Sequence, residues 1–281
     1  MKYADLHLHT YFSDGTLSPA QIIALAKKSE LRCISITDHD SVAAYLSPLP
    51  QVDIEIIPGI ELTADFNNTE VHILGYFIEY TQPWFQEELS RICQIRMSRM
   101  REMCQKLTDL GMPIGVDEIM KFAGHNCVGR LHLARMLVRK GFVSNPQEAF
   151  NKYIGDKGPA YVSKFKLIPQ EVIALILKAK GVPVLAHPYS LPAQDMIFDF
   201  IKDGLMGLEV VYPEYTPAQI ASYIKIAKDN NLVITGGSDY HGEAKPGVKI
   251  GMIDVGIDLI DALKKAHQKV NPGRELRSLT G

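Results

Sequence analysis

Cysteine is scarce in this chain, which has 4 cysteines among 281 residues. No two of them are spaced as C-x-x-C, so neither a structural zinc knuckle nor a disulfide framework is indicated. Long apolar runs are also missing, since none approaches the roughly 20 residues that a helix needs to cross a bilayer. No signal-peptide pattern precedes the first predicted strand. We therefore expect no membrane association and a cytoplasmic location.

The chain has no excess of one charge either. Its formal net charge at pH 7 is −2, from 30 Lys and Arg against 32 Asp and Glu. This balance excludes bulk electrostatic attraction to nucleic acid, so a nucleic-acid substrate would need a local basic patch. A hydrophobic content of 46% with 22% charged residues is typical of a soluble globular protein. The length fits one large α/β domain, or a domain with an insertion.

Strand patterns alternate with helix patterns over most of the chain. Helix starts are marked by capping boxes such as Ser18-Pro19-Ala20-Gln21. Strands are predicted at residues 3–8, 32–37, 54–60, 71–77, 182–186, 208–212 and 232–236. Such alternation predicts a parallel sheet. About seven strand–helix units favour a distorted, TIM-like (β/α)7 barrel with its chemistry at the C-terminal mouth. An open doubly wound sheet is the alternative, although it would bring fewer strand ends to one point.

One interval breaks the alternation. Residues 81–166 predict helices only, at 83–110, 116–122, 130–140 and 146–153. We expect this interval to be a helical insertion that covers the barrel mouth. The predicted organisation is therefore a first barrel part at 1–80, the helical lid and substrate domain at 81–166, and a second barrel part at 167–281.

Histidines and carboxylates gather at the predicted strand ends. His7 and His9 leave the same face of a strand, and the turn at Asp14 can return a carboxylate to them. An isolated H-x-H pair would more often be a pair of exposed polar residues. Here, however, histidines recur in or after strand after strand: His7, His9, His39, His72, His187 and His241. Imidazole and carboxylate ligands without thiolate suit Zn, Mn or Fe. The set is too large for one ion, so two or three divalent ions are expected, with one carboxylate bridging.

A family resemblance follows from the motifs DLHLHTYFSDG, ITDHD, PGIEL, the strand with His72, AHP and GSDYHG, in this order. Together they resemble the PHP (polymerase and histidinol phosphatase) family of metal-dependent phosphoesterases, over residues 1–80 and about 168–253. The resemblance implies a trinuclear centre. One ion would be held by His7, His9, Glu61 and Asp239. Glu61 would bridge to a second ion held by His72 and His187. The third would be held by Asp14, His39 and His241.

Three aspartates, Asp14, Asp38 and Asp40, need separate comment. Asp14 stands where some family members have histidine, which resembles the branch acting on nucleoside 3′,5′-bisphosphates and short RNA ends. Asp38 and Asp40 are left off the ligand set, because Asp38 can orient a ligand from behind and Asp40 can cap a turn.

The predicted lid offers substrate-binding candidates. Arg130 and His132 fall in the first turn of a predicted helix, where positive charge is disfavoured unless an anion binds there. The alternative is a solvated arginine on a helix surface. A similar G-R-x-H motif contacts substrate phosphate in the branch named above. Residues 157–166 are basic with interleaved aromatics, so Lys164 is expected to guide a phosphodiester chain, with a solvated charged loop as the alternative.

The expected reaction is hydrolysis of the phosphate ester of nucleoside 3′,5′-bisphosphates, short oligoribonucleotide 5′ ends, or both. A hydroxide shared by two ions would attack phosphorus in line. The residues expected to act in catalysis are Asp14, Arg130, His132 and His241, and those expected to bind substrate are Asp14, Arg130, His132 and Lys164. The alternatives are a phosphatase for histidinol phosphate or another small monoester, and a non-catalytic metal-binding accessory module. No obligate protein partner is expected.

Overall fold

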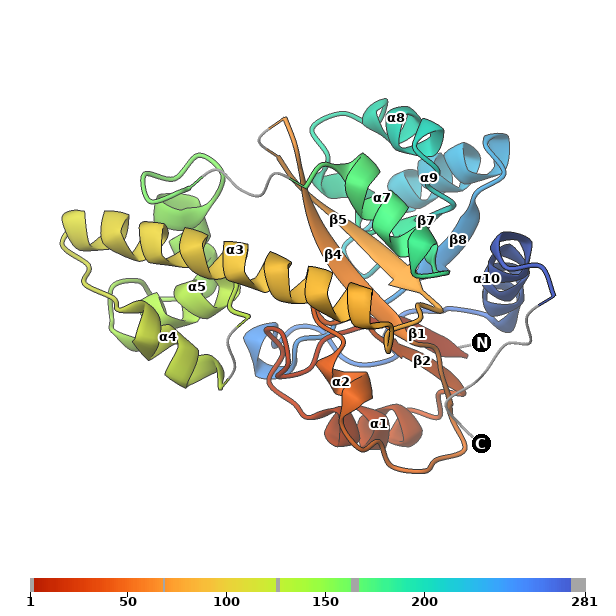
Figure 1. The fold of residues 1–281 in the computed structure, drawn as a ribbon, viewed down its shortest axis with the longest axis horizontal. Coiled ribbons are helices and arrows are strands. Elements are labelled where there is room, and N and C mark those ends of the chain that lie inside the picture. Colours follow the sequence, from red (N-terminus) through yellow and green to blue (C-terminus); the bar gives the residue numbers. More distant parts are fainter. Residues whose placement is uncertain (1–2, 68, 125–126, 163–166, 274–281) are drawn as a thin grey trace.

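The computed structural model describes residues 3–67, 69–124, 127–162 and 167–273. Within them the strands form two sheets (Figure 1). The first sheet is parallel, in the order β1 (Ala4–Leu8), β2 (Cys33–Ile36) and β3 (Glu55–Ile56). The second follows chain order: β4 (Gly59–Phe66), β5 (Thr69–Tyr76), β6 (Val182–Leu185), β7 (Gly207–Val211) and β8 (Val233–Gly236).

The pairing corrects the predicted parallel sheet. β4 and β5 form an antiparallel hairpin, and β5 is also antiparallel to β6, whereas β6, β7 and β8 run parallel. Two residues separate Phe66 from Thr69, a connection too short for the crossover that parallel strands need. The strand expected at 54–60 is divided between β3 and β4. Glu61 is consequently the third residue of a long strand rather than a strand-end residue.

The strand ladders of the described residues do not close into a barrel. The two sheets are linked through isolated bridges, which include Leu8 with Tyr240 and His39 with Glu61. Both of these bridges involve segments that carry candidate ligands. The fold is therefore mixed α/β, with two sheets that approach each other where the histidines lie.

Helices flank the sheets largely as the sequence predicts. They are α1 (Pro19–Lys28), α2 (Ala43–Leu46), α7 (Pro169–Lys178), α8 (Met196–Lys202), α9 (Pro217–Asp229) and α10 (Ile257–Val270). Two short 3-10 turns, η2 (Pro188–Ser190) and η3 (Gly242–Ala244), follow ligand segments. The capping box of α1 is present, with the Ser18 hydroxyl accepting from the Gln21 N–H. The pattern of residues 192–203 predicts a helix from Pro192, whereas α8 begins at Met196, and α10 was not predicted.

A separate helical region lies to one side of the sheets (Figure 1). It contains α3 (Pro83–Asp109), α4 (Val116–Ala123), α5 (Arg130–Arg139) and α6 (Pro146–Ala149), which continues into a π-helical turn, η1 (Phe150–Ile154). The first part of α3 packs Phe85, Leu89 and Ile92 into the core against the sheets. From Met97 onward it joins a second hydrophobic cluster that ends at Ala160. One long helix thus belongs to two cores.

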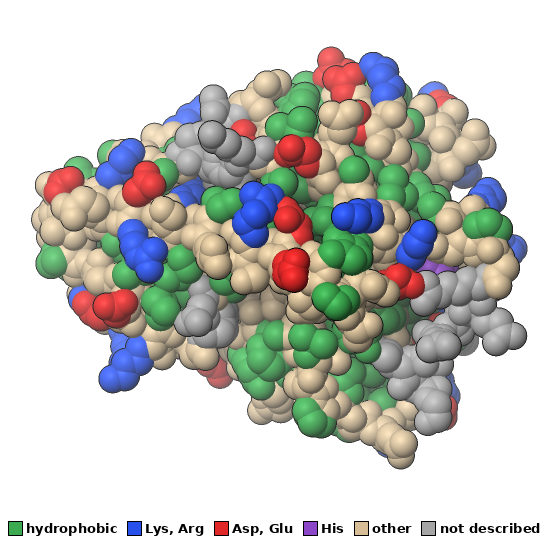
Figure 2. Space-filling model, in the orientation of Figure 1, with side chains coloured by type: hydrophobic (Ala, Val, Ile, Leu, Met, Phe, Trp, Pro, Cys, Tyr) green, Lys and Arg blue, Asp and Glu red, His purple; other side chains and the backbone are tan. Residues whose placement is uncertain are grey.

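The surface shows no segregation of charge on the face seen in Figure 2, where basic and acidic side chains are interspersed. Among the described helices, none is both long and apolar enough to cross a membrane.

Candidate metal centre

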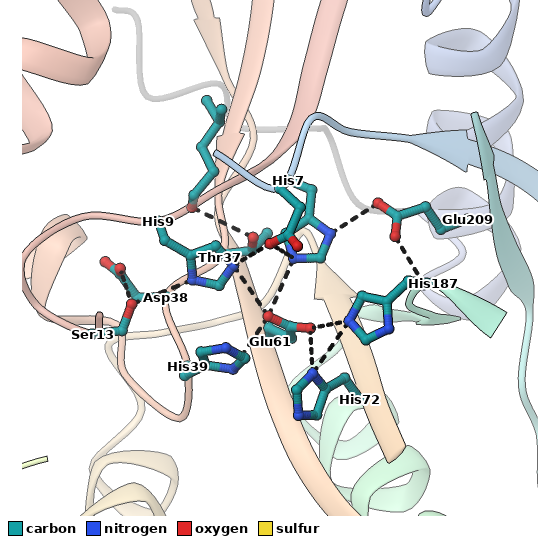
Figure 3. Close-up of polar contacts among 12 residues, drawn as sticks. His7, His9, Ser13, Thr37, Asp38, His39, Glu61, His72, His187 and Glu209 are labelled. Atoms are coloured by element: carbon teal, nitrogen blue, oxygen red, sulfur yellow. Dashed lines mark hydrogen bonds and ion pairs between the residues drawn. The ribbon is translucent and has the colours of Figure 1, made fainter. Parts of the chain in front are cut away.

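Glu61 lies at the middle of a group of imidazoles that come from both sheets (Figure 3). Its Oε2 atom lies 3.2 Å from a ring nitrogen of each of three histidines: His7, His9 and His39. Its Oε1 atom lies 2.9 Å from His72 Nδ1 and 3.1 Å from His187 Nε2. The carboxylate therefore faces one set of nitrogens with each oxygen, as a bridging ligand would.

Two aspartates and a sixth histidine complete the group. Asp239 Oδ1 lies 3.3 Å from His9 Nε2 and 3.5 Å from His241 Nδ1. Asp14 Oδ1 lies 3.1 Å from His241 Nε2, and the His9 and His241 rings stack at 4.1 Å. All nine candidate ligands named from the sequence are thus in one place, although the first and last of them, His7 and His241, are 234 positions apart.

The candidate ligands form three overlapping sets, and within each set the ligand atoms all lie within 4.8 Å of one another. They are His9, Asp14, His39 and His241; His7, His9 and Asp239; and His39, Glu61 and His72. This grouping resembles the implied division into three ions but differs from it, since Glu61 belongs only to the set with His39 and His72. His9 and His39 each belong to two sets, and His187 is joined to the centre through Glu61 and through His72, whose Nδ1 is 3.3 Å from His187 Nε2.

The buried atoms of the site fit a group of divalent cations. His9 Nε2, Asp14 Oδ1 and His39 Nδ1 are all buried, and none makes a well-aligned hydrogen bond among the described residues, although each lies 3.1–3.3 Å from an atom of another candidate ligand. Burying such atoms without a partner costs about 1–3 kcal/mol each, so native proteins rarely do so without a ligand. The donors are imidazole nitrogens and carboxylate oxygens, which bind Zn, Mn and Fe well. The residues present therefore fit metal ions.

The pKa values of the clustered histidines and of Glu61 also indicate a site for cations. Burial favours the neutral form of His9, but the nearby carboxylates of Asp239, Glu61 and Asp14 outweigh it and raise the pKa of His9 to about 10. Burial likewise opposes the charge of His72, and Glu61 raises its pKa to about 9. Burial would raise the pKa of Glu61, yet the surrounding histidines hold it well below its usual range. Without cations, imidazolium groups supply the positive charge that the carboxylates require.

Two outer carboxylates orient candidate ligand histidines, and the sequence analysis identified neither of them. Glu209 of β7 lies 2.8 Å from His7 Nδ1, and its second oxygen accepts the His187 N–H at 2.9 Å. Glu70 of β5 lies 2.7 Å from His72 Nε2. Each contact leaves the other ring nitrogen facing Glu61, which is how carboxylates orient metal-binding histidines. Two sequence features could have identified them: the charged Glu209 within the apolar strand LEVVY, and the i, i+2 spacing of Glu70 and His72.

The aspartates left off the ligand set have separate roles. Asp38 accepts hydrogen bonds from the Thr10 N–H and from the Ser13 hydroxyl, at 2.7 and 2.6 Å. The Ser13 Oγ atom lies 3.3 Å from His9 Nδ1, so Asp38 acts on His9 through Ser13. Asp40 accepts the Thr63 N–H at 3.0 Å and forms an ion pair with Arg96 of α3. Asp40 therefore connects the site to the helical region rather than only capping a turn.

The backbone around the site adopts unusual conformations. Asp40, His187 and Asp239 have φ values of 50°, 28° and 55°, which non-glycine residues adopt at a cost. At Gly237, a Cβ atom would lie 2.1 Å from the His7 Cβ. Only glycine lets the segment after β8 pass so close to β1. This approach places Asp239 beside His7 and His9.

Two further side chains hydrogen-bond to Asp239 on the side away from the histidines. Its Oδ2 atom accepts a hydrogen bond from the Tyr212 hydroxyl at 2.8 Å and one from the Lys245 ammonium at 3.0 Å. These contacts leave Oδ1 for the histidines. Neither Tyr212 nor Lys245 was singled out in the sequence, because each lies outside the motif that carries Asp239.

In the helical region, Arg130 and His132 make contacts that the sequence analysis did not predict. Arg130 is largely buried, and it pairs with Glu70 and Asp156, both at 2.6 Å. It is therefore not a solvated arginine on a helix surface. The Nδ1 atom of His132 accepts the Gly129 N–H at 3.1 Å, which caps α5. Lys164 lies outside the described residues.

Two further arginines lie near the start of α5. Arg96 and Arg99 of α3 are each 9% exposed. Together with Gly129 and Arg130 they line a small cavity. Burial lowers the pKa of Arg99 to about 10, and its Nη2 atom has no hydrogen-bond partner among the described residues. The site is therefore bordered by positive charge on the side of the helical region.

Comparison with known proteins agrees with this geometry. The PHP domain model matches residues 5–82. The chain is 31% identical to a 5′-3′ exoribonuclease of Haemophilus influenzae over 279 residues, 95% of this chain and 99% of that one. It is 28% identical to a 3′,5′-nucleoside bisphosphate phosphatase of Chromobacterium violaceum over 260 residues, 89% of this chain and 91% of that one. A solved metal-dependent phosphoesterase from Bifidobacterium adolescentis superposes with a TM-score of 0.83 at 29% identity, covering 94% and 96% of the two chains.

The fold, the ligand cluster and these similarities define a metal-dependent phosphoesterase, a hydrolase of phosphoester bonds. The chain belongs to the PHP family. The expected family and enzyme class are therefore confirmed, and the alternative of a non-catalytic module is set aside.

Proposed function

We propose that this enzyme hydrolyses the phosphate ester of nucleoside 3′,5′-bisphosphates, of short oligoribonucleotide 5′ ends, or of both. The observation that carries the proposal is Glu61, whose two oxygens face different sets of histidine nitrogens within one buried cluster. The named activities of the similar exoribonuclease and bisphosphate phosphatase support this substrate class. We expect the cytoplasm to be its location.

The proposed centre contains three divalent ions, taken from Mn, Zn or Fe. Glu61 would hold ions on both the His7 side and the His72 side. The first ion is assigned to His7, His9, Glu61 and Asp239, the second to Glu61, His72 and His187, and the third to Asp14, His39 and His241. When bound, such ions neutralise phosphate oxygens and lower the pKa of a coordinated water to about 7.

The chain's own residues have complementary tasks in this proposal. Asp14 and His241 lie 3.1 Å apart at the edge of the cluster, where they would meet the substrate as well as an ion. Arg130 and His132, at the start of α5, would hold the substrate phosphate and the charge that develops on it. To do so, Arg130 has to exchange at least one of its two carboxylate partners for phosphate.

We further propose that residues 1–80 and 167–281, whose strands form the two sheets, together make a distorted, TIM-like (β/α)7 barrel, and that residues 81–166 form a lid. The separate hydrophobic cluster between Met97 and Ala160 supports a lid with its own core. The ion pair between Arg96 and Asp40 supports its position over the site. Lys164 remains assigned to the substrate chain.

Phosphate release from adenosine 3′,5′-bisphosphate with Mn²⁺, followed with malachite green, tests the function. We expect release by the wild-type protein and its loss in Glu61→Gln. The matched control is Glu118→Gln, which removes an exposed carboxylate paired with Lys140 in the helical region. A 5′-phosphorylated short oligoribonucleotide and histidinol phosphate complete the screen. Higher kcat/KM on histidinol phosphate would favour the small-monoester alternative, and no release from any substrate with metal present would refute the proposal.

A further inference from the structure

Glu70 joins the metal cluster to the helical region. One of its oxygens, Oε1, lies 2.7 Å from His72 Nε2, and the other, Oε2, lies 2.6 Å from Arg130 Nη2. Because the Glu70 carboxylate can only accept, Nε2 of His72 carries the proton of this hydrogen bond, and Nδ1 is left facing Glu61. One carboxylate therefore contacts a candidate ligand on β5 and the first residue of α5.

The comparison with Glu209 shows what is particular about Glu70. Glu209 also holds a ligand histidine, but its second oxygen accepts a backbone N–H of the sheet region. The second oxygen of Glu70 pairs instead with a side chain that has a further carboxylate partner, Asp156. Glu209 is fully buried, whereas the Glu70 side chain is 14% exposed. The contact of Glu70 can thus change while the sheets keep their structure.

We infer that Glu70 is a positioning residue that makes metal binding at His72 depend on the state of Arg130. With Arg130 in place, Glu70 is held against His72, and the ring presents Nδ1 to the cluster. When Arg130 turns toward another anion, Glu70 loses that support, and the orientation of His72 changes with it. This inference rests on the proposed function for the assignment of His72 as a ligand.

Metal titration tests the inference without any substrate. Metal-free protein is titrated with Mn²⁺ in competition with a chelating dye, and the bound metal is counted by elemental analysis. Removal of a carboxylate behind a metal-binding histidine lowers metal affinity by about 10–100-fold. We expect a loss of this size for the weakest-held ion in Glu70→Ala and a smaller loss in Glu70→Gln, which keeps the shape of the side chain.

Arg130→Gln is the decisive variant, because Arg130 contacts no candidate ligand directly. We expect it to change the affinity of the same ion, and to have no further effect in the Glu70→Ala background, since coupled residues are not additive. The matched control is Asp156→Asn, which removes the other partner of Arg130 and leaves Glu70 on His72. Its metal affinity is expected to equal that of the wild type.

The variants distinguish a wrong ligand set from a wrong role for Glu70. If His72→Ala keeps all of its metal, the ligand set of the proposed function is wrong. If His72→Ala loses an ion while both Glu70 variants bind metal like the wild type, Glu70 does not position His72 and the inference is overturned. Wild-type metal affinity in Arg130→Gln, or additive effects in the double variant, would overturn the link to the helical region.

Discussion

The two halves of the candidate metal centre differ in what holds them. His7 and His9 are fully buried, and the groups behind them belong to the sheet region: Glu209 on β7, and Asp38 acting through Ser13. The side chains of His39, His72 and His187 are 13–16% exposed. Behind this second half lie two ion pairs to the helical region, Arg96 with Asp40 beside His39, and Arg130 with Glu70 on His72.

The difference indicates that one half is preorganised by the fold and the other is completed by the helices. The buried half can form once the sheets have paired. The more exposed half depends on side chains of α3 and α5, which have a core of their own. Substitutions in the first half should therefore affect folding as well as metal binding, and those in the second should mainly affect metal and substrate.

Glu61 belongs to both halves, and its loss should have the largest effect. In Glu61→Ala we expect kcat to fall by about 10³-fold or more, because charge stabilisation at the phosphate and the link between the two halves are both lost. Steady-state phosphate release and elemental analysis of the purified variant check this. Wild-type metal content would contradict the central place of Glu61.

Glu209 and Glu70 provide the direct contrast between the halves. Glu209→Ala leaves the fully buried His7 without its partner, so we expect the metal-free protein to lose about 3 kcal/mol of unfolding free energy. Glu70→Ala should cost less, since the Glu70 side chain is 14% exposed and Arg130 keeps Asp156 as a partner. Urea unfolding followed by circular dichroism measures both values. Equal losses would show that the two halves are held alike.

Proton release distinguishes metal binding from simple charge pairing. The raised pKa values of His9, about 10, and His72, about 9, mean that both rings are protonated at pH 7 without metal. Metal must displace these protons, so its affinity should rise as the pH is raised from 6 to 9. In the metal-free protein the sign is opposite. The stability from these rings is complete below their unfolded pKa near 6.5 and is lost as the pH rises through 9 and 10.

Calorimetry in buffers of different ionisation enthalpy counts the released protons. A buffer-independent enthalpy of metal binding at pH 7 would contradict the protonated state. The His9→Gln variant is the control, because it should release fewer protons at the same pH.

Lys164→Ala should have the smallest effect. If Lys164 guides a phosphodiester chain, we expect about a threefold rise in KM for a short oligoribonucleotide, the size of a single weak charge contact. KM for adenosine 3′,5′-bisphosphate should stay unchanged. The difference should shrink at high salt because solvent-exposed charges are screened. An equal rise for both substrates would argue against contact with the chain.

Much of the site was predictable because its ligands lie in short motifs. His7 and His9 share a strand face by spacing alone, and Asp14 follows in the next turn. The outer carboxylates were less accessible, since Glu209 reaches His7 from 202 positions away. Which carboxylate lies behind which histidine depends on the pairing of the strands, and spacing does not report it.

The fold was predicted less well than the ligands. An apolar run such as residues 71–77 fits a parallel or an antiparallel strand equally, so the direction of β5 depended on the short connection at 67–68. The closed barrel was predicted by counting strand–helix units. β4 and β5 do not form such a unit, because they pair as an antiparallel hairpin with no helix between them. Helix α10 was missed although Ile260, Leu263 and Ala266 recur at helical spacing and are buried.

The shared helix α3 has a mechanical consequence. Its 27 residues make a rod about 40 Å long, fixed at one end by Phe85, Leu89 and Ile92. A tilt of about 5° at the fixed end would displace the far end by about 3 Å. Because the pair between Arg96 and Asp40 lies close to the pivot, such a swing would move the distal helices far more than it would disturb His39.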